Sequence, residues 1–348
     1  MTRIAIIGAG VAGLTAVYAL RTHAVERTVF EKSRGYGGRA ATRGREGCRY
    51  DHGAPFFTAP SPRVRDLVTA HLPSEQLIKI GRPVGAFNGD GDLLRRSASD
   101  EGPHWTYYQG ISTFGKLLAR TGQADVHRDT RVERLRRDGD RWAVQTATGT
   151  LHEPYDAVVL TPPAPQTAAL LHRSALDASP FPALHAALAS VDYAPQFAYV
   201  WAYDRPLSRP APYHGFVSHD AEHLLSWIGF EHDKPGHAPA GTHLLVLHTS
   251  PDWTRSRVDR EPETFLPEVR AQAESVLDTT LHAPIWTDAQ RWRYARPTGM
   301  LDPEVHEMGA AVGLYLAGDY VVGQGAVGAA IESGFEVAER IRDGVVRE

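Results

Sequence analysis

The first thirty residues carry a pattern of strand, turn, helix and strand. Residues 3–7, in which Arg3 precedes four apolar residues, are typical of a buried strand, and residues 11–21 have a helical pattern. Residues 28–31 have the composition of a second buried strand. Together these segments predict one βαβ unit of about the usual length, and therefore a parallel sheet.

Further segments show the same two kinds of pattern. A helix is expected from Ser61, because a serine followed by proline is a common start, and another is expected after Ser112. A turn at 138–140 separates two segments of strand composition. The remaining helices are expected at 262–281 and 326–343, and the strands at 130–135, 141–146, 156–161 and 313–319.

Residues 166–284 have a different composition, with scattered prolines and alternating or aromatic-rich runs at 196–203, 224–230 and 243–249. We interpret these runs as strands of a mixed or antiparallel sheet outside the βαβ unit. The expected fold class is α/β (α+β mixed). The expected domains are a discontinuous nucleotide-binding domain at 1–80, 105–165 and 285–348, and a substrate-binding domain at 81–104 and 166–284.

Charge and cysteine content exclude several classes of protein. Thirty-seven Lys and Arg against 41 Asp and Glu give a net charge of -4, which provides no basic field for nucleic acid or a membrane surface. Cys48 is the only cysteine, so an internal disulfide and multi-cysteine metal sites are excluded. The histidines lack metal-ligand spacing, and no metal is expected. We expect a cytoplasmic protein.

The segment Gly8-Ala9-Gly10-Val11-Ala12-Gly13 follows the first strand and opens the first helix. In that position Gly8 permits a tight turn, Gly10 lets a pyrophosphate approach, and Gly13 allows close packing of helix on strand. Glu31 ends the second strand, where a carboxylate accepts hydrogen bonds from the adenosine ribose. The sequence therefore predicts a bound dinucleotide.

Two more glycine-rich segments indicate that this dinucleotide is a flavin. Gly37-Gly38-Arg39 lies just past Glu31, where two glycines allow close backbone approach and Arg39 could neutralise a phosphate. Gly318-Asp319 ends a strand and could bind a ribityl hydroxyl, while the following helix could point its N-terminus at the flavin. Taken singly, the first is compatible with a surface turn and the second with a strand–helix unit closing a sheet.

These motifs, together with Glu31-Lys32-Ser33-Arg34, Ala41-Thr42-Arg43, Asp51-His52-Gly53-Ala54 and residues 156–162, resemble the FAD-dependent flavin amine oxidase superfamily. Residues 245–253 and 291–297 are most similar to its bacterial renalase-like group. The resemblance implies a Rossmann-like FAD-binding domain of the glutathione-reductase/amine-oxidase type, with a second substrate domain built on a mixed β-sheet. It also implies FAD held non-covalently.

The resemblance and the motifs together define the expected site. Pro55-Phe56 departs from the family pattern, which has Gln-Tyr there, so one amide beside the flavin is lost. Expected catalytic or substrate-contacting residues are His248, Trp292, Tyr294 and Phe56. Expected FAD-binding residues are Gly8, Gly10, Val11, Ala12, Gly13, Glu31, Lys32, Gly38, Arg39, Ala54, Pro55, Phe56, Val132, Gly318, Asp319 and Val327.

Alternatives stay open for several of these residues. His248 is equally consistent with a hydrogen-bonded core histidine, and Trp292 and Tyr294 with ordinary core aromatics. Arg291, Arg293 and Arg296 either bind a substrate phosphate or are solvated.

The expected function is an FAD-dependent oxidoreductase of renalase-like type. It would oxidise a 2- or 6-dihydro isomer of NAD(P) by hydride transfer to flavin N5, with reoxidation by O2 to H2O2; such a hydride donor needs no general base. An amine oxidase or desaturase for a small amine or apolar donor is the alternative, and a non-catalytic FAD-binding redox protein is the second. The expected partner is a small molecule, and the chain is expected to be a monomer or homodimer.

Overall fold

The computed structural model describes residues 1–94, 102–210 and 212–345. A five-stranded parallel sheet has the order β19-β13-β1-β2-β9. Its strands are β1 (Thr2–Ile7), β2 (Val25–Phe30), β9 (Asp125–His127), β13 (Ala157–Leu160) and β19 (Leu314–Leu316). The predicted βαβ unit is therefore confirmed, with the second strand starting three residues earlier than its composition indicated.

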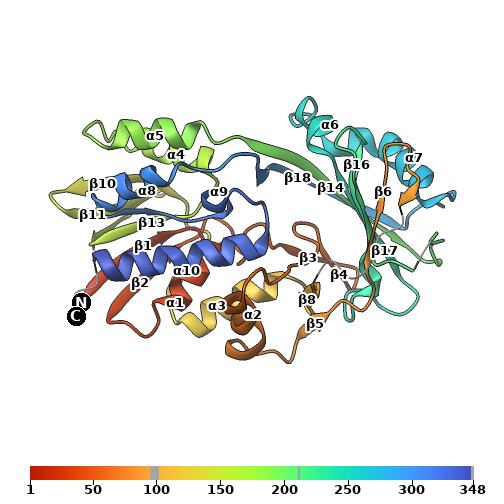
Figure 1. The fold of residues 1–348 in the computed structure, drawn as a ribbon, viewed down its shortest axis with the longest axis horizontal. Helices are drawn as coiled ribbons and strands as arrows, with labels where there is room; N and C mark the ends of the chain where they lie inside the picture. The colour runs from red at the N-terminus through yellow and green to blue at the C-terminus, as the bar shows by residue number, and fades with distance from the viewer. Residues whose placement is uncertain (95–101, 211, 346–348) are drawn as a thin grey trace.

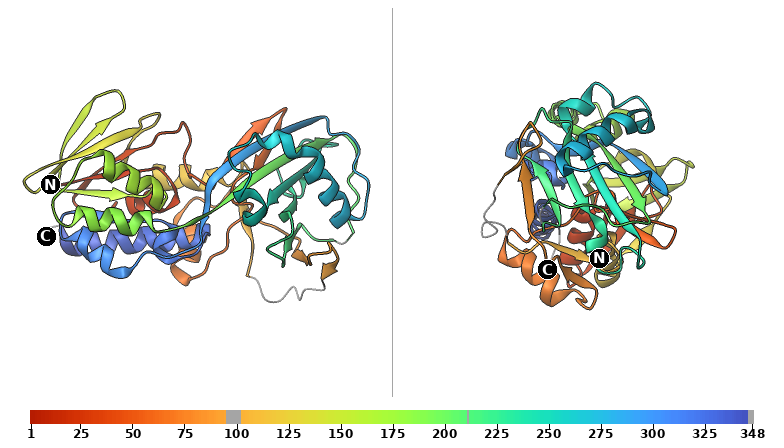
Figure 2. Two further views of the ribbon diagram at one scale, coloured as in Figure 1. Left: turned by 90° about the horizontal axis from the view of Figure 1, so that it is seen from above. Right: turned by 90° about the vertical axis from the view of Figure 1, so that its right-hand side faces the viewer.

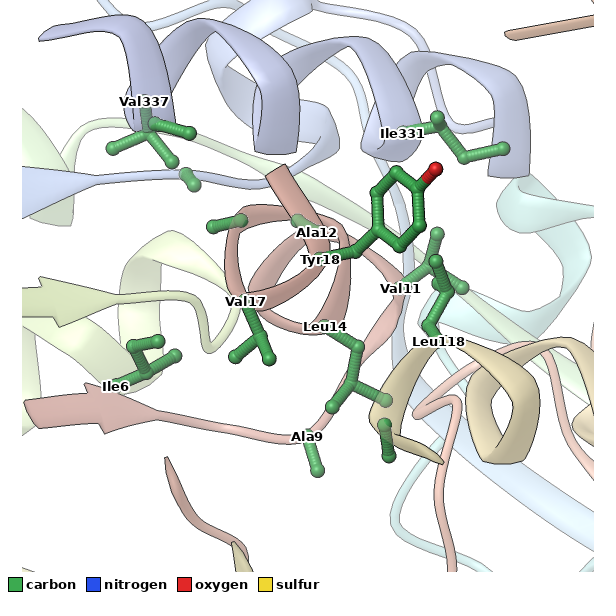
Figure 3. Close-up of a cluster of buried hydrophobic side chains, with 14 of the residues drawn as sticks. Ile6, Ala9, Val11, Ala12, Leu14, Val17, Tyr18, Leu118, Ile331 and Val337 are labelled. Carbon is green, nitrogen blue, oxygen red and sulfur yellow. The ribbon is translucent and has the colours of Figure 1, made fainter. Parts of the chain in front are cut away.

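Both faces of the parallel sheet are buried, and successive residues of each strand point to opposite faces. Ile4 and Ile6 face one hydrophobic cluster, whereas Ala5 and Ile7 face another. The first cluster holds α1 (Val11–Ala19), α3 (Ser112–Gly122) and α10 (Val327–Gly344) against the sheet. Figure 3 shows this packing, with Val17 and Tyr18 of α1 lying between the sheet, α3 and α10.

The second face is covered by helices and a three-stranded antiparallel sheet. The helices are α4 (Ala164–Arg173), α5 (Phe181–Ala189) and α8 (Pro303–Ala310), and the strands are β10 (Val132–Asp138), β11 (Arg141–Thr146) and β12 (Leu151–Tyr155). The domain boundary expected at residue 166 falls inside α4, whose buried residues pack with those of the parallel sheet. The exact domain limits stay a prediction.

A seven-stranded sheet, ordered β18-β14-β17-β16-β15-β6-β7, forms the other lobe (Figure 1). All neighbouring strands are antiparallel except β15 and β6, which are parallel. The sheet is therefore mixed, as predicted from the sequence. Its strands are β6 (Val84–Phe87), β7 (Leu93–Leu94), β14 (Tyr193–Tyr203), β15 (Gly215–Ser218), β16 (Leu225–Phe230), β17 (His243–Thr249) and β18 (Trp286–Pro297). Residues 95–101, within the predicted 81–104 segment, lie outside the described residues, as do 211 and 346–348.

This sheet is also buried on both faces. Phe197, Tyr199 and Trp201 of β14 face α7 (Leu266–Leu277), while Val200 and Ala202 face the hairpin β3 (Thr42–Arg45) and β4 (Cys48–Asp51). The predicted helix at 262–281 is shorter in the structure: a 3-10 turn, η3 (Pro262–Phe265), precedes α7, and Asp278 adopts a left-handed conformation that ends it.

Short elements complete the fold and join the lobes. They are α2 (Pro62–Asp66), the π-helical turn η1 (Leu67–His71), β5 (Leu77–Lys79), β8 (Trp105–Tyr107), the 3-10 turn η2 (Glu231–Asp233), α6 (Pro251–Arg255) and α9 (Asp319–Val322). Viewed from above, the molecule has two lobes joined by the long strands β14 and β18 (Figure 2). Within the described residues, every helix is too short or too polar to cross a bilayer.

Candidate active site

A cavity of about 1070 Å3 is lined by residues of both lobes. Its lining comes from the loop between β1 and α1, the end of β2, the second glycine-rich loop, residues 53–58, strand β18 and the start of α10. All four expected catalytic residues line it, and so do all the expected FAD-binding residues except Gly13, which is buried in α1. The structure thus brings the two predicted sets together; that they bind FAD and substrate stays a prediction.

The first glycine loop has the geometry of a dinucleotide cradle. Gly8 has a φ of +106°, and a Cβ there would lie 2.5 Å from the Thr161 hydroxyl. By contrast, a Cβ on Gly10 would meet nothing within 4 Å, because this glycine borders the cavity. Helix α1 begins after Gly10 without a side-chain cap, so its first N–H groups are available to an anionic ligand.

Glu31 fixes this loop from the end of β2. One carboxylate oxygen accepts a hydrogen bond from the Ala9 N–H at 2.7 Å, and the other accepts from the N–H and hydroxyl of Ser33 at 2.8 and 2.6 Å. Each carboxylate oxygen has two lone pairs, so acceptor capacity remains for a ribose hydroxyl. Glu31 therefore stabilises the conformation of the loop. The contact with the adenosine ribose that the sequence predicts for Glu31 is a separate role.

Arg39 and Asp319 pair with each other across the cavity wall. Both terminal nitrogens of Arg39 donate to the Asp319 carboxylate at 2.7 Å, and one also donates to the carbonyl of Ala295 at 3.1 Å. Burial alone would lower the pKa of Arg39, but Asp319 keeps that pKa above its ordinary value. The guanidinium charge is thus offset by a carboxylate, and the phosphate contact expected of Arg39 stays a prediction.

Aromatic rings form the wall contributed by the second lobe. Phe56 stacks on His104 with centroids 4.1 Å apart and meets Trp227 edge-on at 5.7 Å. Trp292 stacks on His52 at 5.4 Å and donates its indole N–H to the His52 carbonyl at 2.9 Å. A planar ring could be held against this wall.

His248 lies on β17 at the cavity and is 5% exposed. Its Nε2 is buried without a hydrogen-bond partner among the described residues, which does not support the alternative of a fully hydrogen-bonded core histidine. Burial, with smaller contributions from His52, Lys234 and Arg296, lowers the pKa of His248 to about 3. His248 is therefore a neutral polar group facing the cavity.

The charges around the cavity are unequal. Both of its lining carboxylates, Glu31 and Asp319, already have hydrogen-bond partners. Arg291 pairs with Glu261 and Arg293 with Asp259, whereas the side chain of Arg296 has no ion pair or hydrogen bond within the described residues. The lining cations are Lys32, Arg39, Arg131, Arg173, Arg291, Arg293 and Arg296.

Sequence reasoning missed several residues of this region. Gln196 of β14 and the consecutive residues Ser226 and Trp227 of β16 line the cavity. Alternation along a strand does not predict that Ser226 and Trp227 share a site, because they lie where the register of β16 shifts. A buried cluster of Asp51, Glu231, Lys234 and His237 was also missed, because no local pattern links these positions. Ligand atoms of Asp51, Glu231 and His237 lie within 4.8 Å of one another, as in a metal site, but the Lys234 ammonium is bonded to both carboxylates.

Comparison with known proteins defines the class. The family model for flavin containing amine oxidoreductases matches residues 88–342, and that for NAD(P)-binding Rossmann-like domains matches residues 6–70. This is a two-lobed flavin-dependent oxidoreductase. The chain belongs to the flavin containing amine oxidoreductase family, and this assignment confirms the superfamily resemblance seen in the sequence.

Individual relatives are more distant. Protoporphyrinogen oxidases of Nicotiana tabacum and Arabidopsis thaliana are 39% and 38% identical over 66 residues, which is 19% of this chain and 13% of theirs. A proposed protoporphyrinogen oxidase from Exiguobacterium sp. 255-15 has a TM-score of 0.79 at 18% identity, with 98% of each chain covered. A putrescine oxidase bound to putrescine has a TM-score of 0.74 at 13% identity, with 98% of this chain and 99% of that chain covered. These structures share the fold.

Proposed function

We propose that this protein holds FAD non-covalently and oxidises a reduced nicotinamide dinucleotide of the 2- or 6-dihydro type, with O2 as the final acceptor. The observation that carries the proposal is the charge of the cavity: among the residues that the structure describes, the Arg296 side chain has no ion-pair partner, and both lining carboxylates are engaged. Such a wall favours a donor that carries phosphate over one that carries an ammonium group.

The residues present fit FAD. Gly10 leaves open space at the uncapped start of α1, which suits a pyrophosphate, and Glu31 lies at the end of β2 beside it. Cys48 is not among the lining residues and instead borders a separate cavity of about 320 Å3, which supports non-covalent binding. The main cavity is at the upper limit of the roughly 300–1,000 Å3 of ordinary ligand pockets, which is consistent with a dinucleotide and a second molecule.

The proposed reaction asks for positioning more than for acid–base chemistry. A dihydropyridine that loses hydride becomes an aromatic cation, so no side chain has to remove a proton. The bound flavin supplies the hydride acceptor. In the balanced overall reaction, the donor's hydride and one solvent proton end up with O2 as H2O2, while the donor is left as the oxidised dinucleotide.

Residues of this chain have distinct roles in that proposal. Trp292 and Phe56 flank the dihydropyridine ring of the donor and exclude water from it. Arg296 holds a phosphate of the donor through charge-assisted hydrogen bonds. His248 stays uncharged because of its lowered pKa, so it offers the ring a polar contact without repelling the cation that forms.

An amine or apolar donor is the second candidate, and one observation favours it. Phe56, Trp227 and Trp292 present aromatic faces to the cavity, and such faces attract apolar groups as well as cations. This candidate predicts that a diamine or an apolar donor reduces the flavin and that dihydronicotinamides do not.

The experiment is an anaerobic reduction assay with the purified flavin-bound protein. The protein is mixed with the 2-, 4- and 6-dihydro forms of NAD and NADP, and loss of the visible flavin absorbance is followed. Rapid bleaching by a 2- or 6-dihydro form, with the 4-dihydro form as the matched slow control, supports the proposal. If none of these forms bleaches the flavin in protein that dithionite does reduce, the proposal is overturned. A set of amines is then tested in the same assay, because bleaching by an amine would identify the second candidate and no bleaching would indicate a non-catalytic flavoprotein.

A further inference from the structure

One buried ammonium group contacts both ends of the cavity-lining segment 51–55. Lys234 Nζ donates to Asp51 Oδ2 at 3.0 Å and to the Pro55 carbonyl oxygen at 2.6 Å. It also donates to Glu231 Oε1 at 2.9 Å. The Lys234 side chain has no solvent exposure, so water cannot replace any of these contacts without a change in the structure.

The partners of Lys234 are themselves held by hydrogen bonds. Glu231 accepts from the N–H of Asp51 at 2.9 Å and contacts His237 Nδ1 at 2.8 Å. Asp51 accepts from the Thr42 hydroxyl at 2.7 Å and from the Ile111 N–H at 2.9 Å. These bonds connect η2 and the loop after it to the β3–β4 hairpin and to the start of α3, so the cluster joins the two lobes.

The charges of the cluster are mutually stabilised. Burial would lower the pKa of Lys234, but Asp51 and Glu231 keep that pKa above its ordinary value. Burial would raise the pKa of Asp51, but Lys234 and His237 hold that pKa below its ordinary value. An uncompensated charge here would be strongly destabilising, so the ammonium and its two carboxylates act as a unit.

The segment that Lys234 closes is part of the cavity wall. Gly53, Ala54, Pro55 and Phe56 all line the cavity. The Ala54 N–H donates to the Arg39 carbonyl at 3.0 Å. At the end of the segment, the Pro55 carbonyl accepts a hydrogen bond from Lys234 and from no other described residue. Phe56 follows Pro55 directly, so the contact of Lys234 with the Pro55 carbonyl constrains how Phe56 meets Trp227 and His104, together with the backbone pairing of Phe57 with Trp105.

We propose that Lys234 is a positioning residue, which closes residues 51–55 into a rigid loop and so sets the wall against which flavin and donor lie. Its effect on catalysis rests on the proposed function, whereas its effect on the loop does not. The same ammonium occupies the position that a metal ion would need between Asp51 and Glu231.

The test compares two double variants of the flavin-bound protein. Lys234→Met with Glu231→Gln removes one positive and one negative charge from the cluster, and methionine keeps most of the side-chain volume. Arg209→Met with Asp233→Asn is the matched control, because it removes a neighbouring ion pair of 2.6 Å that makes no contact with residues 51–55. A chelator in all buffers prevents a metal from replacing the ammonium.

The first readout is hydrogen exchange of the amides of residues 52–54 and 56, measured against the amides of β13 as an internal reference. We expect exchange of these amides to rise about tenfold or more in the Lys234 variant and to stay unchanged in the control. Equal protection in the Lys234 variant and the wild type would overturn the proposal, and so would a rise that the control reproduces.

The second readout separates positioning from binding. With a donor that bleaches the wild-type flavin, we expect the limiting bleaching rate of the Lys234 variant to fall about tenfold, while the donor concentration that gives half of this rate stays similar. The reason is that a displaced cavity wall would misorient the bound donor without preventing its binding. An unchanged limiting rate would contradict the catalytic part. If no donor bleaches the wild type, the proposed function fails while hydrogen exchange still decides the role of Lys234 in the loop.

Discussion

Arg39 and Asp319 lie 280 positions apart in the sequence and form a two-bond ion pair at the cavity wall. Asp319 is nearly fully buried, so the pair excludes water from one of its members. It links the second glycine-rich loop to the first residue of α9. Two motifs that the sequence presents as separate parts of a flavin site are therefore one unit.

Breaking this pair is expected to reduce both stability and flavin retention. Arg39→Met leaves the Asp319 charge buried without its partner, at a cost of about 3 kcal/mol in the free energy of unfolding. The matched double variant, Arg39→Met with Asp319→Asn, should recover part of that loss. Denaturant unfolding and the flavin-to-protein absorbance ratio measure the two effects, and additive losses in the double variant would contradict this coupling.

Glu31→Ala should weaken FAD binding while leaving the fold intact. The substitution removes the acceptor for the Ala9 N–H and the expected partner of the ribose, and we expect about a tenfold or greater rise in the FAD dissociation constant. Glu26→Ala on the same strand is the control, because Glu26 is exposed and pairs with Arg3. Unchanged flavin retention in the Glu31 variant would count against the assigned mode of binding.

Arg296→Gln should raise the KM for an anionic donor about tenfold or more, since a hydrogen bond to a charged group contributes about 1.5–3 kcal/mol. Arg293→Gln is the control, because Arg293 lies on the same strand but already pairs with Asp259. FAD content should stay the same in both variants. An equal rise in KM in both variants would show that the effect comes from the lost positive charge alone, and it would contradict the proposed contact between Arg296 and a phosphate of the donor.

Stability should fall as the pH falls below the ordinary histidine pKa of 6.5. Burial lowers the pKa of His248 to about 3 and that of His52 to about 4. Between these values and 6.5 the unfolded chain binds a proton at each histidine that the folded chain does not. The free energy of unfolding therefore decreases on acidification, by up to about 1.4 kcal/mol per pH unit for each histidine.

Urea unfolding at about pH 7, 6 and 5 checks this dependence. His248→Gln should make the dependence shallower, whereas His219→Gln, at an exposed position, should leave it unchanged. An identical slope in the His248 variant and the wild type would show that His248 does not contribute.

Local patterns explain which parts of the fold could be predicted. The alternation at 243–249 predicts β17 with its observed bounds, and the glycine loop before residues 11–21 predicts the turn into α1. Each of these segments carries its own signal in consecutive residues. The helix at 262–281 was too long because the left-handed end at Asp278 depends on geometry that apolar spacing does not report.

The missed residues act through contacts between distant positions. Lys234 and Asp51 are 183 positions apart, and neither stands in a pattern that indicates the other. Burying a lysine is unfavourable in isolation, so composition alone predicts an exposed side chain for Lys234. His248 could be singled out because it is a polar residue in an apolar strand, which is a signal that one segment can carry; it lines the cavity, and its contact with a substrate stays a prediction.

The order of the strands in the parallel sheet has a consequence for synthesis of the chain. Strands β1, β2, β9 and β13 precede β14 to β18 of the second lobe, but β19 and α10, which complete the sheet and pack on α1, follow the whole second lobe. While the ribosome is still adding residues 190–300, the apolar face of α1 lacks its cover and Arg39 lacks Asp319. A nascent chain therefore cannot complete the expected flavin site until the second lobe has been made, and during that interval the exposed apolar face is prone to aggregation.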